Sequence, residues 1–203
     1  MALVFDLDGV LLDSETDLGW LRTALDATLE AVGQPPTPVN RDRLAPGNLS
    51  NIDRVAEQWG LSSRELWRMR NDHYLEAKLD AIKSRSIRAF PDIEVIGSVR
   101  DRPAHIISNS PAVVVEAFVE TNGYDRLFDV RLGRGDGLEW LDRLKPDPFF
   151  YERLVAATGR KEGFLYVGNA ATDRAFARNT GMDYHHIDRD AGDSLHGLRD
   201  RAR

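Results

Sequence analysis

The sequence of 203 residues contains no cysteine, which excludes disulfide bonds, thiolate zinc sites and cysteine nucleophiles. Any bound metal must therefore be held by oxygen or imidazole ligands. The sequence also has no excess of positive charge, because its formal net charge is -6, whereas a generic nucleic-acid-binding protein needs a basic face. No apolar run approaches the roughly 20 residues of a membrane-spanning helix. We therefore expect a cytoplasmic protein without nucleic-acid or membrane partners.

What remains is the composition of an ordinary globular protein. Hydrophobic residues make up 42% of the chain and charged residues 30%, a balance that excludes disordered, coiled-coil and collagen-like chains. The length allows either one sizeable core or a main domain with a smaller companion. The order of the expected elements decides between these two organisations.

Three short apolar runs, each followed at once by polar residues, indicate buried strands. They are residues 2–5, 105–107 and 164–167. Continuous apolarity is typical of parallel strands that are covered on both faces. Helices with readable ends follow these runs, one of them expected to begin with Ser110 as its N-cap. Further strands are expected at 130–132 and 184–187. This alternation predicts an α/β fold with a doubly wound, Rossmann-like parallel sheet.

The stretch from residue 14 to residue 84 differs from the rest, because it offers helical periodicity and no convincing strand. One helix is expected on each side of a proline-rich break, and Ser62 opens a third helix with a capping box. We therefore predict a small helical cap domain at 14–84, inserted after the first strand. The α/β core is then formed by residues 1–13 and 85–203.

Two aspartates follow the first expected strand, at the sheet edge where open α/β proteins bind their ligands. Asp6 and Asp8 lie two residues apart, so in extended backbone their carboxylates project to the same side, roughly 7 Å apart along the chain. Gly9 follows where the chain must turn sharply, and a residue without Cβ relieves that turn. The two carboxylates are therefore placed to act on one ligand.

Other polar residues at the same edge suit phosphate chemistry. A carboxylate attacks a phosphate dianion poorly because like charges repel, so such a site needs a divalent cation and a fixed ammonium group. Hard oxygen ligands favour Mg²⁺, and Asn169 and Asp173 offer such oxygens. Lys145 offers the ammonium group. Ser108, with the backbone N–H groups of the turn at 108–110, offers a place for the phosphate.

With these residues in this order, the sequence closely resembles the haloacid dehalogenase (HAD) superfamily of phosphohydrolases. The resemblance rests on four motifs, which are Asp6-Leu7-Asp8-Gly9-Val10, Ser108-Asn109-Ser110, Lys145-Pro146 and Gly168-Asn169-Ala170-Ala171-Thr172-Asp173. The segment from Leu11 to Glu15 also looks like the flap that leads into a helical cap of the C1 type. The likeness points to the subgroup of phosphoglycolate phosphatases and β-phosphoglucomutases.

The resemblance implies a Mg²⁺-dependent phosphohydrolase that cleaves a small-molecule phosphate monoester through an aspartyl-phosphate. It makes Asp6 the nucleophile and Asp8 the general acid/base, with Ser108 and Lys145 completing the catalytic set. The phosphate-binding residues are then Gly9, Ser108, Asn109 and Lys145. We expect the protein to be a monomer or a homodimer.

The implied metal site contains a departure from the family pattern. Its ligands are Asp6, the backbone carbonyl of Asp8, Asn169 and Asp173, but the family's phosphatases usually have aspartate where this chain has Asn169. An amide oxygen still coordinates Mg²⁺, yet the site loses one negative charge, so weaker Mg²⁺ binding is expected. Two alternatives stay open, a phosphomutase on the same core and a non-catalytic binding or regulatory protein whose metal site Asn169 has disabled.

Overall fold

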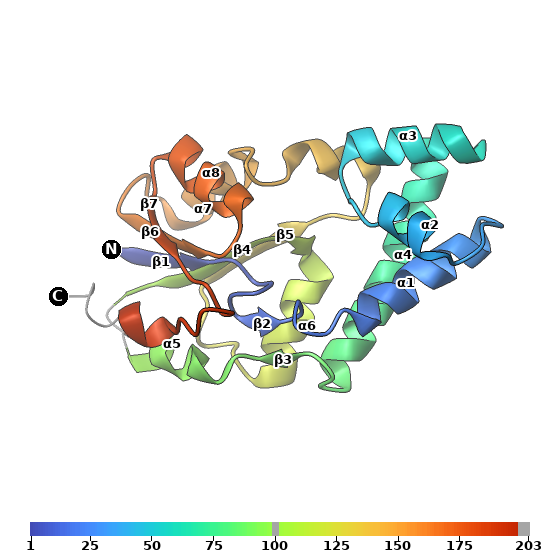
Figure 1. Ribbon diagram of the computed structural model, residues 1–203. Coiled ribbons are helices and arrows are strands. Elements are labelled where there is room, and N and C mark those ends of the chain that lie inside the picture. The colour runs from blue at the N-terminus through green and yellow to red at the C-terminus, as the bar shows by residue number, and fades with distance from the viewer. Residues whose placement is uncertain (99–101, 199–203) are drawn as a thin grey trace.

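The computed structural model describes residues 1–98 and 102–198. Five parallel strands form its main sheet in the order β5-β4-β1-β6-β7. The strands are β1 Ala2–Phe5, β4 Ala104–Pro111, β5 Val130–Arg134, β6 Phe164–Gly168 and β7 Asp183–His186. With helices on both faces of this sheet (Figure 1), the predicted doubly wound α/β class is confirmed.

Alternate residues of each central strand pack against different helices. In β1, Leu3 and Phe5 enter the cluster that contains residues of α5 and α6, whereas Ala2 and Val4 enter the cluster that contains residues of α7 and α8. The helices are α5 Glu94–Ser98, α6 Ala112–Asn122, α7 Phe149–Thr158 and α8 Ala171–Thr180. Short 3-10 turns lie at η1 Pro91–Ile93, η2 Leu138–Arg143 and η3 Leu195–Leu198. Because both faces are covered, the central strand β1 is buried and apolar along its whole length.

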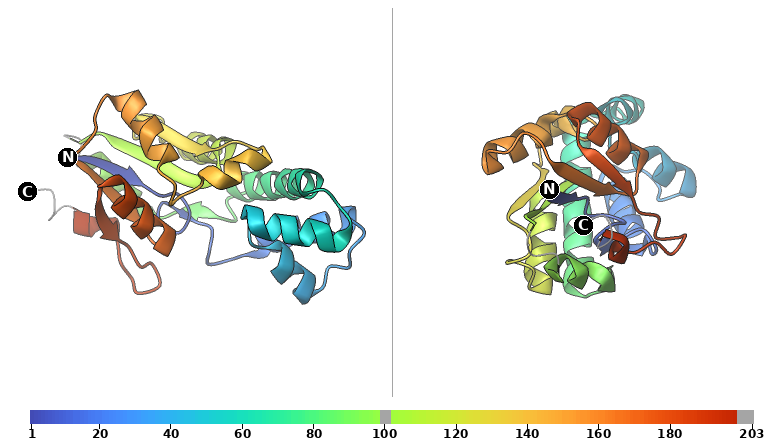
Figure 2. Two further views of the ribbon diagram at one scale, coloured as in Figure 1. Left: turned by 90° about the horizontal axis from the view of Figure 1, so that it is seen from above. Right: turned by 90° about the vertical axis from the view of Figure 1, so that its left-hand side faces the viewer.

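Four helices lie together beyond the carboxyl ends of the strands (Figures 1 and 2). They are α1 Gly19–Ala31, α2 Pro38–Leu44, α3 Leu49–Trp59 and α4 Ser63–Lys83. We call them the helical lobe. They share a buried apolar cluster that includes Leu29, Ile52 and Leu66. The chain enters the lobe after β2 Leu12–Asp13 and returns through β3 Arg88–Ala89, and these two strands pair antiparallel. A domain division at residues 14 and 84 remains a prediction.

Two local expectations differ from the structure. An unexpected helix, α2, begins at the last residue of the proline-rich break, because Thr37 accepts a hydrogen bond from the backbone N–H of Asn40 and Pro38 occupies the first turn. The expected N-cap role of Ser110 is wrong, since β4 continues to Pro111, which itself precedes the first residue of α6. The hydroxyl of Ser110 is instead engaged by Asp8. Among the described residues, no helix has both the length and the apolarity needed to cross a lipid bilayer.

At Gly133, the backbone of β5 packs closely against the start of α6. A Cβ at this position would lie 2.7 Å from the backbone of Ala112 and from the carbonyl oxygen of Ser110. We expect Gly133→Ala to lower the free energy of unfolding by about 2 kcal/mol, because backbone must move to admit the methyl group. Gly197→Ala is the matched control, since its Cβ would meet nothing within 4 Å. Equal unfolding free energies for the two variants in urea would contradict this packing.

Candidate functional site

The carboxyl ends of three adjacent strands bring the predicted residues to one edge of the sheet. β1 lies between β4 and β6, so Asp6, Ser108 and Asn169 emerge next to one another. Lys145 comes from the loop before α7, and its Nζ lies 2.8 Å from Asp6 Oδ1 and 2.7 Å from Asp173 Oδ1. The structure thus gathers an ammonium group and two carboxylates from segments far apart in the chain.

The Asp6 carboxyl is buried, with only 8% of the residue exposed. Its Oδ1 accepts hydrogen bonds from the backbone N–H of Leu7, at 2.8 Å, and from Lys145. Burial, followed by the charge of Asp173, raises the pKa of Asp6 to about 7, although Lys145 acts in the opposite direction. A cation bound beside Asp6 would favour its ionised form.

Lys145 is held in place from several directions. Besides the two carboxylates, its Nζ donates to the hydroxyl of Tyr166 at 2.8 Å. Burial would lower the pKa of Lys145, but the charges of Asp6 and Asp173 outweigh this and raise it. Asn109 fixes its backbone, because Asn109 Oδ1 accepts from the Lys145 N–H at 2.8 Å and Nδ2 donates to its carbonyl at 3.3 Å. The ammonium group is therefore charged and rigidly placed.

Asp173 is fully buried, and both of its oxygens meet protein donors. Oδ2 accepts from the backbone N–H groups of Asn169, at 3.2 Å, and Ala170, at 3.0 Å. Oδ1 accepts from Lys145. In this arrangement Asp173 orders the loop after β6 and neutralises Lys145. Its role as a metal ligand remains a prediction.

Ser108 and Asn109 both lie within β4. The Oγ of Ser108 is buried and accepts a hydrogen bond from the backbone N–H of Ser110 at 3.1 Å. Asn109 is occupied by the backbone of Lys145. Because β4 pairs with β1, with Ile106 opposite Phe5, Ser108 lies at the same edge of the sheet as Asp6. Asn109 instead holds the backbone of the lysine. The phosphate-binding roles of both residues remain predictions.

The Asp8 carboxylate is surrounded by donors that the sequence did not suggest. Lys78 Nζ donates to Oδ1 at 2.5 Å, Ser14 Oγ donates to Oδ1 at 2.6 Å, and Ser110 Oγ donates to Oδ2 at 2.6 Å. Burial would raise the pKa of Asp8, but the charge and hydrogen bond of Lys78 outweigh it and lower the pKa. Asp8 is therefore held as a carboxylate.

One stripe of helix α4 makes these contacts between the lobe and the sheet. Trp67, Asn71, Tyr74 and Lys78 recur at intervals of four and three, which places them on one side of the helix. Lys78 is 1% exposed and also donates to the Tyr74 hydroxyl at 3.1 Å. Closer to the start of α4, Trp67 Nε1 donates to the carbonyl of Asp136 at 2.7 Å. A polar and aromatic stripe of helical period was the sequence signal for this interface.

Arg134 strengthens the same interface from the end of β5. Its guanidinium donates to Asn71 Oδ1 at 2.6 Å and lies 4.8 Å from the ring centre of Trp67. Burial lowers the pKa of Arg134 to about 10. Polar contacts at Asp8 and at Arg134 thus join the lobe to the edge of the sheet.

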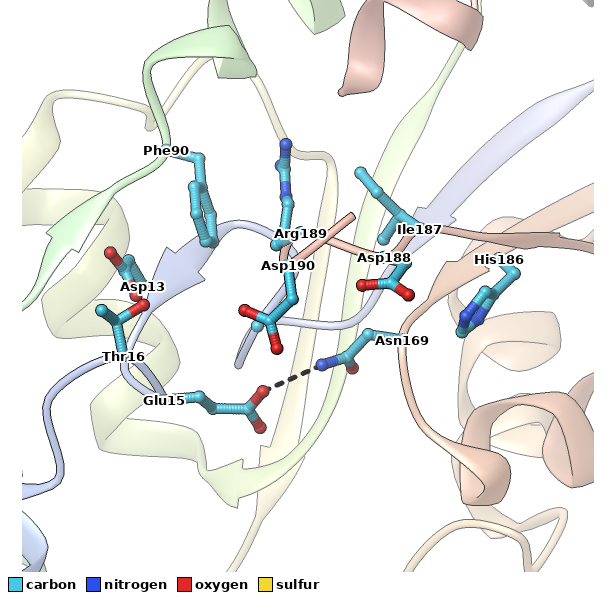
Figure 3. Close-up of a pocket in the computed structure, with 11 residues that line it drawn as sticks. Asp13, Glu15, Thr16, Phe90, Asn169, His186, Ile187, Asp188, Arg189 and Asp190 are labelled. Atoms are coloured by element: carbon cyan, nitrogen blue, oxygen red, sulfur yellow. Dashed lines mark hydrogen bonds between the residues drawn. The ribbon is translucent and has the colours of Figure 1, made fainter. Parts of the chain in front are cut away.

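A pocket of about 260 Å³ opens beside Gly9, between the flap and the loop after β6 (Figure 3). A Cβ at Gly9 would lie 2.1 Å from Asn169 Nδ2 and 2.4 Å from a carboxylate oxygen of Glu15, so any other residue at this position would displace both groups. In the part of the chain that the structure describes, no three acidic or histidine side chains form a ready-made metal cluster. The oxygens available here nevertheless suit a hard cation that keeps several waters.

The chain is similar to known proteins over most of its length. The chain matches the family model of haloacid dehalogenase-like hydrolases over residues 3–187. A phosphoglycolate phosphatase of Photorhabdus laumondii is 28% identical over an alignment of 194 residues, covering 89% of this chain and 76% of that protein. A phosphoglycolate phosphatase of Psychrobacter arcticus is 30% identical over 192 residues, covering 89% and 80%.

The fold also has solved counterparts. A hydrolase of the haloacid dehalogenase-like family from Streptococcus pneumoniae superposes with a TM-score of 0.67 and 18% identity. The superposition covers 92% of this chain and 84% of the other. At this identity the likeness bears on the fold alone.

The raised pKa of Asp6 has a consequence for stability. Between the ordinary aspartate pKa and about 7, the folded protein binds a proton that the unfolded chain has released, so stability falls as the pH rises. We expect the gain in melting temperature from Asp6→Asn to grow between pH 4.5 and pH 8, by about 5 °C with a chelator present. Asp53→Asn, at an exposed position, controls for the lost charge. If the gain in melting temperature from Asp6→Asn does not change with pH, burial does not raise the pKa of Asp6.

Removing the Lys78 charge should raise the pKa of Asp8, because burial then acts with less opposition. We expect Lys78→Met to shift the midpoint of the Asp8 carboxyl titration upward in ¹³C NMR. Lys83→Met, at an exposed position of the same helix, should leave that midpoint in place. Identical Asp8 titrations in the wild type and Lys78→Met would show that the ion pair does not form in solution.

Proposed function

The chain belongs to the haloacid dehalogenase-like hydrolase family, and on this premise we propose that it hydrolyses a small phosphate monoester through Asp6. The resemblance seen in the sequence is confirmed by the family match and the relatives. The expected enzyme class, a phosphoric monoester hydrolase, is confirmed on the same basis. The observation that carries the residue-level proposal is the buried contact of Lys145 with Asp6 and Asp173.

In the proposed first step, an Asp6 carboxylate oxygen attacks the phosphorus and the bond to the leaving alcohol breaks. Lys145 offsets the charge that accumulates on Asp6 and on the phosphoryl oxygens, in a buried setting where such an interaction is strong. Ser108 donates a hydrogen bond to the phosphoryl group. Asp8 passes a proton to the leaving oxygen, so the alcohol departs neutral.

In the second step, Asp8 accepts a proton from water as that water attacks the phosphorus of the aspartyl-phosphate. Asp6 is released and inorganic phosphate forms. The contacts of Asp8 with Lys78, Ser14 and Ser110 favour its ionised form, which is the form this step requires. As the acid of the first step, Asp8 must first gain a proton, so the Lys78 contact must loosen during turnover.

Mg²⁺ fits this proposal because the donors at the site are hard oxygens. The residues that would hold it are Asp6, Asn169 and the backbone carbonyl of Asp8, with Asp173 as the further predicted ligand. When bound, Mg²⁺ would neutralise charge on the phosphate and on the carboxylate, which allows two anions to approach. In the chain itself, Lys145 supplies part of that neutralisation.

The relatives suggest which ester to test first. Two of them are named phosphoglycolate phosphatases, so we propose a small ester of that kind as the substrate. Arg70 of α4 is buried, and its guanidinium donates to the carbonyls of Leu44 and Ala45, at 3.0 and 2.6 Å, so these nitrogens are not available to an anionic substrate.

The test is release of inorganic phosphate from a panel of phosphate esters, beginning with 2-phosphoglycolate, at saturating Mg²⁺. We expect turnover by the wild type and a loss of at least about 10³-fold in Asp6→Asn, since the amide is not nucleophilic. Asp53→Asn is the control for charge. Isomerised sugar phosphate in place of free phosphate would favour a mutase, and no turnover on any ester would favour a non-catalytic protein.

A further inference from the structure

The amide of Asn169 makes a contact that the sequence motif did not suggest. Its Nδ2 donates to a carboxylate oxygen of Glu15 at 3.0 Å, and Figure 3 shows the two side chains pointing toward each other. The residues are 154 positions apart in the chain. A carboxylate from the flap therefore stands next to the residue that carries an amide in place of the family's usual aspartate.

The contact lies directly over the turn that follows the nucleophile candidate. Gly9 has a φ of 68°, and a Cβ there would collide with both Asn169 Nδ2 and Glu15. The hydrogen bond between the two side chains uses Asn169 Nδ2 and one carboxylate oxygen of Glu15, so Asn169 Oδ1 and the second oxygen of Glu15 take no part in it. Each partner of the contact thus retains an oxygen that can be offered to a cation.

The pocket around this contact has several acidic side chains in its lining. Its lining includes the carboxylates of Asp13, Glu15, Asp188 and Asp190. The guanidinium in the same lining belongs to Arg189, whose two terminal nitrogens donate to the carboxylate of Asp92 at 2.6 and 3.1 Å. Arg189 is therefore paired with Asp92, so its positive charge does not neutralise the four carboxylates of the pocket lining.

We propose that Glu15 supplies to the metal site of this protein the carboxylate that Asn169 lacks. Glu15 and Asn169 Oδ1 would face the cation side by side, restoring one negative charge to the ligand set from the flap in place of the loop after β6. The inference rests on the proposed function, because it concerns the Mg²⁺ site of that reaction. If Glu15 is a ligand, binding of the cation should also hold the flap in one position, because Glu15 belongs to the flap.

A double-mutant cycle on Mg²⁺ affinity tests this inference without any substrate. The four proteins are the wild type, Glu15→Gln, Asn169→Asp and the double variant, and the binding of Mg²⁺ alone is measured by isothermal titration calorimetry. Glu15→Gln keeps the size of the side chain and its amide oxygen can still accept from Asn169. Glu30→Gln, at an exposed position of α1, is the matched control for net charge.

We expect Glu15→Gln to weaken Mg²⁺ binding by about tenfold or more, the loss typical of removing a metal-site partner. Asn169→Asp should tighten binding, and in that background Glu15→Gln should cost less than about threefold, because the aspartate then supplies the charge. Glu30→Gln should bind as the wild type does. The non-additive pattern is what a shared charge requires.

Two other outcomes separate the possible failures. If Asn169→Asp tightens Mg²⁺ binding but Glu15→Gln leaves the affinity unchanged, Glu15 only tethers the flap and the inference is overturned, while the proposed function stands. If none of the four proteins binds Mg²⁺, the metal site itself is wrong, and the proposed function fails together with the inference.

Discussion

The site depends on one buried ionic contact, in which Lys145 lies between Asp6 and Asp173. Burying an unpaired charge is costly. Here the positive charge of Lys145 is buried together with two carboxylates that pair with it. Much of the surrounding structure serves this contact. Asn109 fixes the lysine backbone, Tyr166 accepts a hydrogen bond from its ammonium, and the loop after β6 is ordered by the far oxygen of Asp173. The phosphoryl chemistry we propose uses the positive charge that this arrangement retains.

A second ionic contact makes two neighbouring aspartates chemically different. Burial and a nearby carboxylate raise the pKa of Asp6, while Lys78 from the helical lobe lowers that of Asp8. Two carboxylates with separated pKa values are suited to separate roles, here nucleophile and acid/base. Because Lys78 belongs to α4, the contact of the lobe with the sheet edge favours the ionised form of Asp8.

The sequence predicted the sheet well because buried parallel strands are continuously apolar and end at polar residues. It also predicted that Asp6 and Lys145 lie at the same edge of the sheet, where an ion pair joins them, whereas their catalytic roles stay predictions. Contacts made by the inserted helices could not be predicted in this way. Lys78 and Asp8 are 70 residues apart and Ser110 and Asp8 are 102 apart, and periodicity shows which face of a helix is buried but not its partner. Ser110 was misread because a serine before proline has the local pattern of a helix cap.

The central claim is that Asp6 carries the phosphoryl group during turnover. Quenching the enzyme during turnover of 2-phosphoglycolate or another ester that it hydrolyses, followed by borohydride reduction, converts an aspartyl-phosphate to homoserine, which peptide mass spectrometry locates in the chain. The account predicts homoserine at position 6, dependent on substrate and missing from Asp6→Asn. Turnover without modification at position 6, or with modification at another carboxylate, would contradict it.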